Sequence, residues 1–576
     1  MKTQRETNNG VFLCVLCGKS SVLRTIAFQG LLLCLFCVFP LQAFATTYYL
    51  DSANSDPGVG TLANPWQKIS SIENISSGDA ILFKRGGIWH ESLLVPSSGI
   101  TVGSYGTGTQ PILDASLPVR GQWTKISSYI YSTPWATQPG VLFYKRAAKP
   151  SITTLGFASV PSSLESGAIL LQLDGVYSNL WVTSKTANTV SGISLFNIHE
   201  DKKIYVRQLI ECREKQWPTS LGYPKVVNSP KGLTQPGHWH WAAGTLYLFS
   251  DSAPSSITVA VGDKPYGIQA TDRNNLIIEN LTVRGANEVG VFLLNTSETT
   301  VRNLRIQSSG SLGHKTGLLL FNSSNNTIIQ NSIDSVLKNG IALYAEGGQT
   351  RNNTLSGNSV SNVGAAGITL SSDGNAKNVS SNIIEKNLIS GANTMSYDGA
   401  GIYTIFAGSN MMRKNTIRNC GTATLRSAGI MADGNTLPLT IDSNIIENNS
   451  IGGIAVSDTG HQIINNRLEY NGAPSWDNGQ VLFFPVFAPA KNCTVTGNTM
   501  TAGLKQSLLF GESGSTSSHT IDHNTYSSVE KFPFAWSGVS MNFANWKRKT
   551  KHDSHSTYTS KFDSIQNSKY SATGKR

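Results

Sequence analysis

Five residues in the second half of the chain have side chains that can neutralise an acid or transfer a proton. They are His314, Lys315, Lys338, Tyr403 and Arg426. A Lys or Arg side chain can neutralise the carboxylate of a uronic acid, and a Lys, His or Tyr side chain can remove the neighbouring C5 proton. Together they would supply the parts of a β-elimination site. Each residue alone is typical of a solvated surface, so this hypothesis needs a fold that gathers them on one side.

Four acidic residues offer a second kind of chemistry. They are Glu346, Asp373, Asp433 and Asp458, and each comes one or two residues before a glycine. Two such carboxylates about 5–5.5 Å apart would suit a retaining glycoside hydrolase. Clustered carboxylates also suit Ca²⁺, which is a hard cation. The following glycines favour a plainer interpretation, in which these acidic residues form turns.

Aromatic residues lie at related positions in the same part of the chain. Phe321, Tyr344 and Tyr403 could seat sugar rings, with Lys315 and Asp433 as further substrate-binding residues. The alternative is that a loop or the C-terminal tail covers these rings.

Asp398 is a further candidate because it has the same offset in its repeat as Arg426 has in the next. The two side chains could form an ordinary ion pair, or they could belong to a site. Asp398 also lies in the longest repeat, and extended loops on rigid scaffolds often carry function.

A repeat connects all these residues. A Gly-apolar-x-apolar pattern recurs at intervals of 23–34 residues, and a column of asparagines recurs in phase with it. The pattern begins at Gly290, Gly317, Gly340, Gly367, Gly401, Gly429, Gly453 and Gly479. The asparagines are Asn280, Asn303, Asn331, Asn358, Asn387, Asn415, Asn444, Asn466, Asn498 and Asn524. Two locked periods of this length are the signature of a solenoid.

The repeat unit is built from strands, because each segment alternates apolar and polar residues with period two. In residues 340–344, Ile341 and Leu343 are expected to face inward and Ala342 and Tyr344 outward. Parallel strands of successive repeats stack about 4.8 Å apart, so residues of equal offset form columns. Asparagine suits the corners and can bond to the next asparagine along the axis. The sequence therefore predicts an all-β parallel β-helix of about ten coils over residues 264–530.

The rest of the chain divides around this solenoid. Residues 46–114 are expected to form an N-terminal cap and the first coils. Residues 115–263 contain six of the eleven tryptophans and predict an inserted β-rich subdomain, with a hairpin near residues 238–249. Residues 531–576 are expected to form a C-terminal cap and a basic tail.

Residues 1–45 predict a signal peptide and therefore a secreted or periplasmic protein. Basic residues precede an apolar run at residues 31–41, and Ala43, Phe44 and Ala45 form a small-x-small cleavage site. A membrane anchor is the alternative, but the run is short for a span. No membrane span is expected to remain after cleavage.

Charge and cysteine content limit the kinds of partner, disulfide and metal site to expect. The net charge is +11, but residues 46–545 hold 34 basic and 32 acidic residues, so the excess lies mainly at the two ends. Nucleic acid is not an expected partner, whereas an acidic polysaccharide could be attracted. Beyond the signal, Cys212, Cys420 and Cys493 are too few and too scattered for a disulfide framework or a metal site.

Three segments resemble bacterial right-handed parallel β-helix proteins of the pectate-lyase-like superfamily. They are GDAILFKRGGIW at residues 78–89, PGHWHWAAGTLYL at residues 236–248, and FANW at residues 543–546 with Asp553 and Ser554. The resemblance implies the fold and extends over residues 46–560. The superfamily includes polysaccharide lyases, glycoside hydrolases, uronan epimerases and non-catalytic proteins, so its fold does not select an activity. The Asn-Thr-Asp and Asp-Asp motifs of polygalacturonases and the Asp-Pro-His-Glu motif of alginate epimerases do not occur in this sequence.

These observations favour an exported protein that binds a polysaccharide and cleaves it by β-elimination. A glycoside hydrolase that uses the acidic residues is the first alternative. A non-catalytic carbohydrate-binding or surface-structural solenoid is the second. No cofactor is predicted apart from the Ca²⁺ that the acidic residues could bind, and the sequence leaves the sugar, the linkage and the oligomeric state open.

Signal cleavage gives a direct test. N-terminal sequencing of the exported protein should begin near Thr46, because cleavage follows Ala45. An intact N-terminus on protein recovered from the cytoplasm would contradict the export prediction.

Overall fold

The computed structural model divides the chain into two units, Met1–Ala45 and Thr46–Arg576. It describes residues 45–561 except for several internal stretches, which are 56, 150, 157–167, 174–175, 188, 195–203, 211–224, 227–229, 310–315, 396–398, 423–424, 435, 473–477, 486–487 and 512–517. The predicted signal segment, Cys212 and the end of the basic tail lie outside the described residues.

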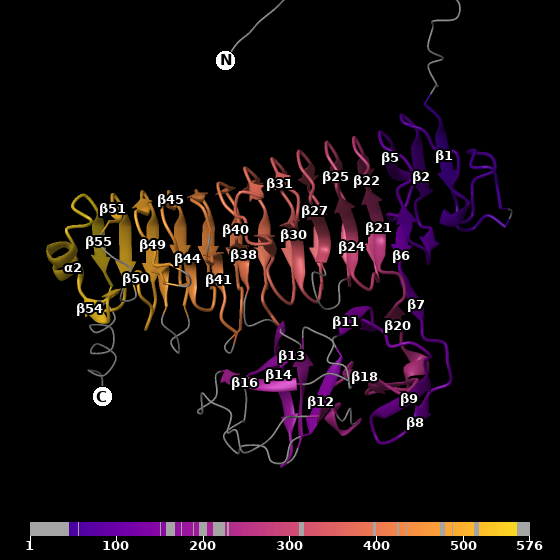
Figure 1. The fold of residues 1–576 in the computed structure, drawn as a ribbon, viewed down its shortest axis with the longest axis horizontal. Helices are drawn as coiled ribbons and strands as arrows, with labels where there is room; N and C mark the ends of the chain where they lie inside the picture. The colour runs from indigo at the N-terminus through magenta and orange to yellow at the C-terminus, as the bar shows by residue number, and fades with distance from the viewer. Residues whose placement is uncertain are drawn as a thin grey trace, which may run out of the picture. The chain divides into compact units, whose positions relative to one another are not determined.

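The second unit is a parallel β-helix in which the coils stack as rungs (Figure 1). Each of three sheets has 13 strands. The first sheet runs from β1 (Thr47–Leu50) to β51 (Thr520–Asp522), and the third runs from β3 (Ile88–Trp89) to β55 (Thr557–Ser560). The predicted all-β solenoid is confirmed, and the strands before the insertion join the same three sheets as those after it.

The second sheet carries the candidate site. Its strands pair in parallel except for the last pair, which is antiparallel. In order they are β4 (Leu93–Leu94), β21 (Tyr266–Thr271), β24 (Val289–Leu294), β27 (Thr316–Phe321), β30 (Asn339–Ala345), β34 (Ile368–Ser372), β38 (Ala400–Ile405), β41 (Ala428–Ala432), β44 (Gly452–Val456), β47 (Gly479–Phe483), β50 (Leu509–Gly511), β53 (Phe534–Trp536) and β54 (Val539–Met541).

Alternation along these strands separates the core from the surface. In β30, Ile341 and Leu343 are fully buried inside the coil, whereas the Tyr344 side chain lies on the outer face and is half-buried. Ile341 pairs with Ile368, which pairs with Ile402, so like residues stack along the axis. Burying each such side chain contributes about 1.5–3 kcal/mol. The predicted inward and outward positions of this strand are confirmed.

The glycine column marks the closest approach between sheets. A Cβ at Gly340 would lie 2.3 Å from a methyl of Val360 and 2.6 Å from the carbonyl oxygen of Gly367. The expected last member, Gly479, is wrong by one residue, because Gly479 pairs with Gly452 and Gln480 takes the column position. Gln480 is tolerated there because its Oε1 accepts a 2.8 Å bond from Asn471.

The asparagine column is a continuous hydrogen-bonded ladder. From Asn331 to Asn524, each side-chain amide donates to the Oδ1 of the next asparagine at 3.0–3.1 Å. The first two expected members, Asn280 and Asn303, are wrong: they occupy the preceding left-handed turn position, and Leu304 donates its backbone N–H to Asn331 instead. The ladder therefore starts at Asn331, two coils later than the sequence predicts.

A second ladder was missed by sequence analysis. Asn326, Asn353, Asn382 and Asn410 bond to one another in the same way at 3.0–3.1 Å. Like the first ladder, it satisfies buried backbone groups at a corner where the chain leaves its sheets. The coils between Asn326 and Asn410 are thus fixed to one another at two corners.

The insertion is β-rich, as predicted, and packs on the coil. Its expected hairpin is formed by β18 (Trp239–Ala242) and β19 (Thr245–Phe249), which pair antiparallel. Buried residues of the insertion, including Val141 and Phe143, pack against Leu337, the residue before Lys338. The insertion therefore lies beside the second sheet near the candidate site.

The C-terminal cap is organised around Trp546. Helix α2 (Phe543–Thr550) places this fully buried indole against Phe534, with ring centroids 5.3 Å apart. The indole N–H donates to Asp553 at 2.7 Å, and Asp553 also accepts the Tyr526 hydroxyl at 2.9 Å. The cap covers the last strand edges, which would otherwise be open to pairing.

Two further observations concern the described part of the chain. None of its helices is long and apolar enough to cross a membrane. Its two cysteines, Cys420 and Cys493, are buried free thiols.

Breaking the second ladder should destabilise the coil strongly. In Asn353→Ala, the backbone and side-chain N–H groups of Asn326 lose the Oδ1 atom of Asn353 as their acceptor. The backbone carbonyl of Ser323 and the Oδ1 of Asn382 each lose the Asn353 side-chain amide as a donor. Buried groups left unpaired cost about 1–3 kcal/mol each, so we expect the free energy of unfolding to fall by at least about 3 kcal/mol.

Urea denaturation followed by circular dichroism measures this loss. The adjacent Asn352→Gly is the matched control, because Asn352 is exposed with a φ of 55°, which glycine adopts freely. We expect that control to cost less than about 1 kcal/mol. Equal losses in the two variants would contradict the stabilising role of the ladder.

Candidate functional site

A hollow of about 230 Å³ opens on the outer face of the second sheet. It spans four consecutive strands, β27, β30, β34 and β38. Its lining combines one cation, two tyrosines, hydroxyl groups and small apolar residues. The lining residues are Thr316, Leu319, Lys338, Asn339, Ala342, Leu343, Tyr344, Ala365, Ala366, Thr369, Ser371, Tyr403 and Ile405.

The strand register makes this hollow. Ala342 pairs with Thr369, which pairs with Tyr403, and Tyr344 pairs with Ser371. The tyrosine rings thus stand two rungs apart, or about 10 Å along the axis, with short side chains on the rung between them. We call this hollow, between Tyr344 and Tyr403, the tyrosine pocket.

Three predicted site residues meet in the tyrosine pocket. Lys338 lies just before β30, at one end of the pocket, while Tyr344 and Tyr403 form its two aromatic walls. Phe321 is outside the lining but packs against Tyr344, with ring centroids 5.1 Å apart. The predicted grouping of a cation with aromatic rings on one side of the coil is therefore present.

An aromatic row continues from the pocket along the coil. Phe321 contacts Phe292 at 6.5 Å between ring centroids, and Phe292 contacts Tyr266 at 4.9 Å. Phe292 is almost fully covered, but Tyr266, Phe321 and Tyr344 are only half-buried. The row thus presents partly exposed ring surface over several consecutive rungs.

Tyr403 separates the pocket from Asp433. Its hydroxyl donates a 2.5 Å hydrogen bond to Oδ2 of Asp433, which lies on the next rung and is half-buried. Burial raises the pKa of Asp433, the Tyr403 bond lowers it, and the charge of Asp458 raises it, with a net rise. A carboxylate with a raised pKa is a stronger base than an ordinary one.

Two of the other acidic candidates bond to turns of the preceding coil. Asp373 accepts the backbone N–H of Gly347 at 3.1 Å, and Asp458 accepts that of Thr436 at 3.0 Å. These bonds agree with the turn interpretation. The four acidic residues do not gather into a metal-binding group. Within the described residues, the one group with three such ligands in reach is Asp522, His523 and His555, where the last coil meets the C-terminal cap.

Arg426, another predicted site residue, does not line the described part of this pocket. It lies three rungs from Lys338, or about 14 Å along the axis. Its backbone carbonyl accepts a 2.6 Å bond from Asn393. His314, Lys315 and Asp398 lie outside the described residues, so the proposed pairing of Asp398 with Arg426 does too.

Sequence analysis missed the polar floor of the pocket. Thr316, Asn339, Thr369 and Ser371 all line it. Thr369 and Ser371 share outward columns with Tyr403 and Tyr344, so the same column analysis could have found them. Asn339 also fixes the next coil, because its Oδ1 accepts the backbone N–H of Ala366 at 3.1 Å.

Comparisons with known proteins agree with the fold. The family described as "right handed beta helix region" matches residues 255–399 and 375–483. No curated protein sequence matches the chain significantly. Together with the parallel pairing of the coils, the family match shows that the chain has a right-handed parallel β-helix fold.

Three solved structures are similar to it at 12% identity. XylC in complex with xylose matches over 90% of this chain and 86% of its own, with a TM-score of 0.50. A glycoside hydrolase matches over 86% and 95%, with a TM-score of 0.44. The GH136 lacto-N-biosidase from Eubacterium ramulus matches over 90% and 67%, with a TM-score of 0.37. At such identity the likeness to XylC shows a shared fold and no more.

The contact between Tyr403 and Asp433 can be tested by titration. In Tyr403→Phe the hydrogen bond that lowers the pKa of Asp433 is lost, while burial and the charge of Asp458 remain. We therefore expect the pKa of Asp433 to rise further in this variant. Carbon-13 NMR of labelled aspartate carboxyls measures it, with assignment by Asp433→Asn. Tyr344→Phe should leave this pKa unchanged, and an unchanged value in Tyr403→Phe would contradict the contact.

Proposed function

We propose that this protein binds an acidic polysaccharide in the tyrosine pocket and cleaves it by β-elimination. The observation that carries the proposal is that Lys338, Tyr344 and Tyr403 line the same hollow. They provide a cation, an aromatic surface and a group that transfers protons. A secreted or periplasmic location, proposed from the signal segment, would bring the protein to such polymers.

Binding follows from the shape and charge of the pocket. A sugar ring between Tyr344 and Tyr403 would have apolar faces against aromatic rings and hydroxyls near Thr369 and Ser371. The Lys338 ammonium would attract the uronic carboxylate. The partly exposed row of Phe321 and Tyr266 would seat further sugars of an extended chain along the coil axis.

The elimination step would use Tyr403 and Asp433 together. As the C5–H bond of the uronic acid breaks, the Tyr403 oxygen takes that proton and passes its own to Asp433, whose raised pKa suits it as an acceptor. Lys338 would stabilise the negative charge that develops on the substrate carboxylate. The electron pair of the broken C5–H bond forms the C4–C5 double bond as the C4–O bond breaks, and the leaving C4 oxygen takes its proton from a water molecule.

A glycoside hydrolase is the second candidate, favoured by one observation. The charge of Asp458 contributes to the raised pKa of Asp433, so the pair could hold one protonated and one ionised carboxyl, as an acid and a base do. Against this, the described lining of the pocket contains no carboxylate. Saccharide binding without cleavage is the third candidate function of the same pocket.

Product chemistry separates these functions. We expect ultraviolet-absorbing unsaturated uronates from at least one acidic polysaccharide in a panel of acidic and neutral polymers. Tyr403→Phe should lower turnover about 10²–10⁴-fold with little change in binding, because it removes the proton-transferring hydroxyl. Lys338→Ala should weaken binding and turnover. Turnover should also fall as the pH drops through the pKa of Asp433, because the protonated carboxyl cannot accept a proton.

Matched variants show which group acts. Tyr344→Phe keeps the ring and should retain turnover, whereas Tyr344→Ala should weaken binding. If the products have new reducing ends but no ultraviolet absorbance, and Asp458→Asn abolishes their formation, the reaction is hydrolysis and not elimination. Binding that Tyr344→Ala weakens, with no product from any polymer, would establish the non-catalytic function instead.

A further inference from the structure

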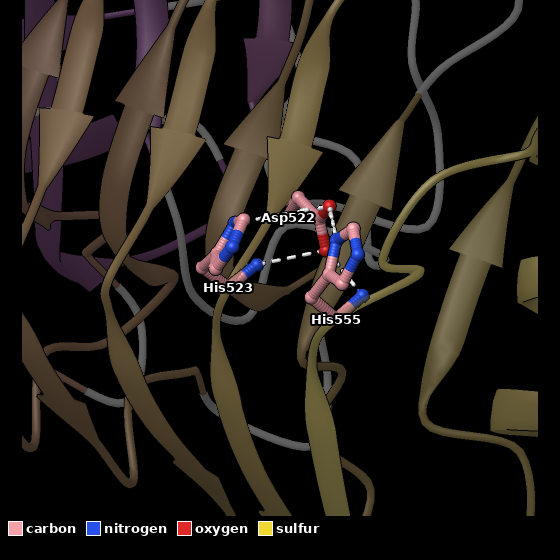
Figure 2. A group of neighbouring side chains, drawn as sticks. All are labelled: Asp522, His523 and His555. Carbon is pink, nitrogen blue, oxygen red and sulfur yellow. Dashed lines mark hydrogen bonds and ion pairs between the residues drawn. The ribbon is translucent and has the colours of Figure 1, made fainter.

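A cluster of three potential metal ligands lies where the last coil meets the C-terminal cap, away from the tyrosine pocket. Asp522 ends strand β51, His523 occupies the next turn position, and His555 lies just before β55 (Figure 2). One ligand atom from each lies within 4.8 Å of the others. The cluster thus joins two segments that are more than 30 residues apart in sequence.

The three side chains lie against one another. The imidazole rings of His523 and His555 are stacked, with centroids 4.9 Å apart and planes at 20°. Oδ2 of Asp522 lies 3.8 Å from Nδ1 of His523 and 2.7 Å from Nδ1 of His555. Ligands about 2.0–2.1 Å from a tetrahedral Zn²⁺ are about 3.3 Å apart, which lies between these two distances. Small movements of the two exposed rings would therefore admit an ion.

The carboxylate is already held in place. Oδ1 of Asp522 accepts the backbone N–H groups of His523 at 2.9 Å and His555 at 2.7 Å, and Oδ2 accepts the Ser554 hydroxyl at 3.0 Å. Such contacts fix the orientation of a ligand before an ion arrives. The backbone of His523 adopts a left-handed turn with a φ of 57°, while its exposed ring keeps room to move.

We propose that Asp522, His523 and His555 form a surface binding site for a divalent transition metal such as Zn²⁺, Ni²⁺ or Cu²⁺. Two imidazoles and one carboxylate suit these ions, whereas Ca²⁺ and Mg²⁺ prefer oxygen ligands alone. The histidine side chains are 65% and 68% exposed, so water can fill the remaining coordination positions.

The site would tie the C-terminal cap to the last coils. His555 belongs to the segment that returns from α2 to β55, and β55 pairs with β52 (Thr525–Ser528), which follows His523 directly. An ion bound across this junction stabilises the closed cap by its binding free energy, since the separated segments cannot share it. Metal availability would then control how readily the cap opens.

Cu²⁺ and Zn²⁺ titrations of the full, untagged chain test the proposal. Other parts of the chain contain Cys and His, so the site is measured as the difference between wild type and variants. His523→Ala and His555→Ala should each raise the Kd for one bound metal ion per chain at least tenfold. The matched control is His90→Ala, which removes an exposed histidine outside the cluster and should leave binding unchanged.

Two further readouts identify the ligands. Electron paramagnetic resonance of the Cu²⁺ complex should show two imidazole nitrogens in wild type and one in either histidine variant. Zn²⁺ should raise the thermal midpoint of wild type and of His90→Ala, but not of His523→Ala or His555→Ala. The proposal would be overturned if all four proteins had equal affinities and equal nitrogen counts. It would also be overturned if His555→Ala bound as many equivalents of metal as wild type.

Discussion

Parallel hydrogen bonding between successive coils is the constraint on which the rest of this structure depends. It fixes the spacing of the rungs at about 4.8 Å and places residues of equal offset in columns. Every inward column must then be apolar or fully hydrogen-bonded, because the interior excludes water. The two asparagine ladders meet the second condition at the corners, where each amide satisfies groups of the neighbouring coils. A shift of one residue in a coil between Asn331 and Asn410 would break both ladders together.

The same register explains the tyrosine pocket. Its walls and floor come from outward columns, so a hollow arises wherever short side chains fall between two rings. Thr369 and Ser371 fill the rung between Tyr344 and Tyr403, and nothing larger stands there. The core columns hold this spacing rigid, which would suit the polymer binding that we propose for the pocket. The insertion, packed on Leu337, fixes the end at which Lys338 lies.

The chemical role of an acidic side chain in this protein depends on the rung that it occupies. Asp433 resembles Asp373 in sequence, since both precede Gly-Asn, yet their surroundings differ. Asp373 accepts a backbone N–H in a turn, whereas Asp433 is half-buried and accepts the Tyr403 hydroxyl. Asp522 accepts two backbone N–H groups as well, but it also meets two histidines at the end of the coil. Identical side chains thus acquire different chemistry from their position in the stack.

The sequence by itself determined the solenoid, because burial on one face of a strand forces a period of two and stacking forces a repeat of coils. It also predicted Lys338, Tyr344 and Tyr403 on one side of the coil, since equal offsets place residues in columns along the axis. Local pattern could not place Gln480 in the glycine column or exclude Asn303 from the ladder, because a one-residue shift at a turn leaves the sequence pattern almost unchanged. Only the tertiary structure decided that Arg426 stands apart, that Tyr403 bonds Asp433 and that His555 meets Asp522, because these contacts depend on how long side chains and returning segments fold across the rungs.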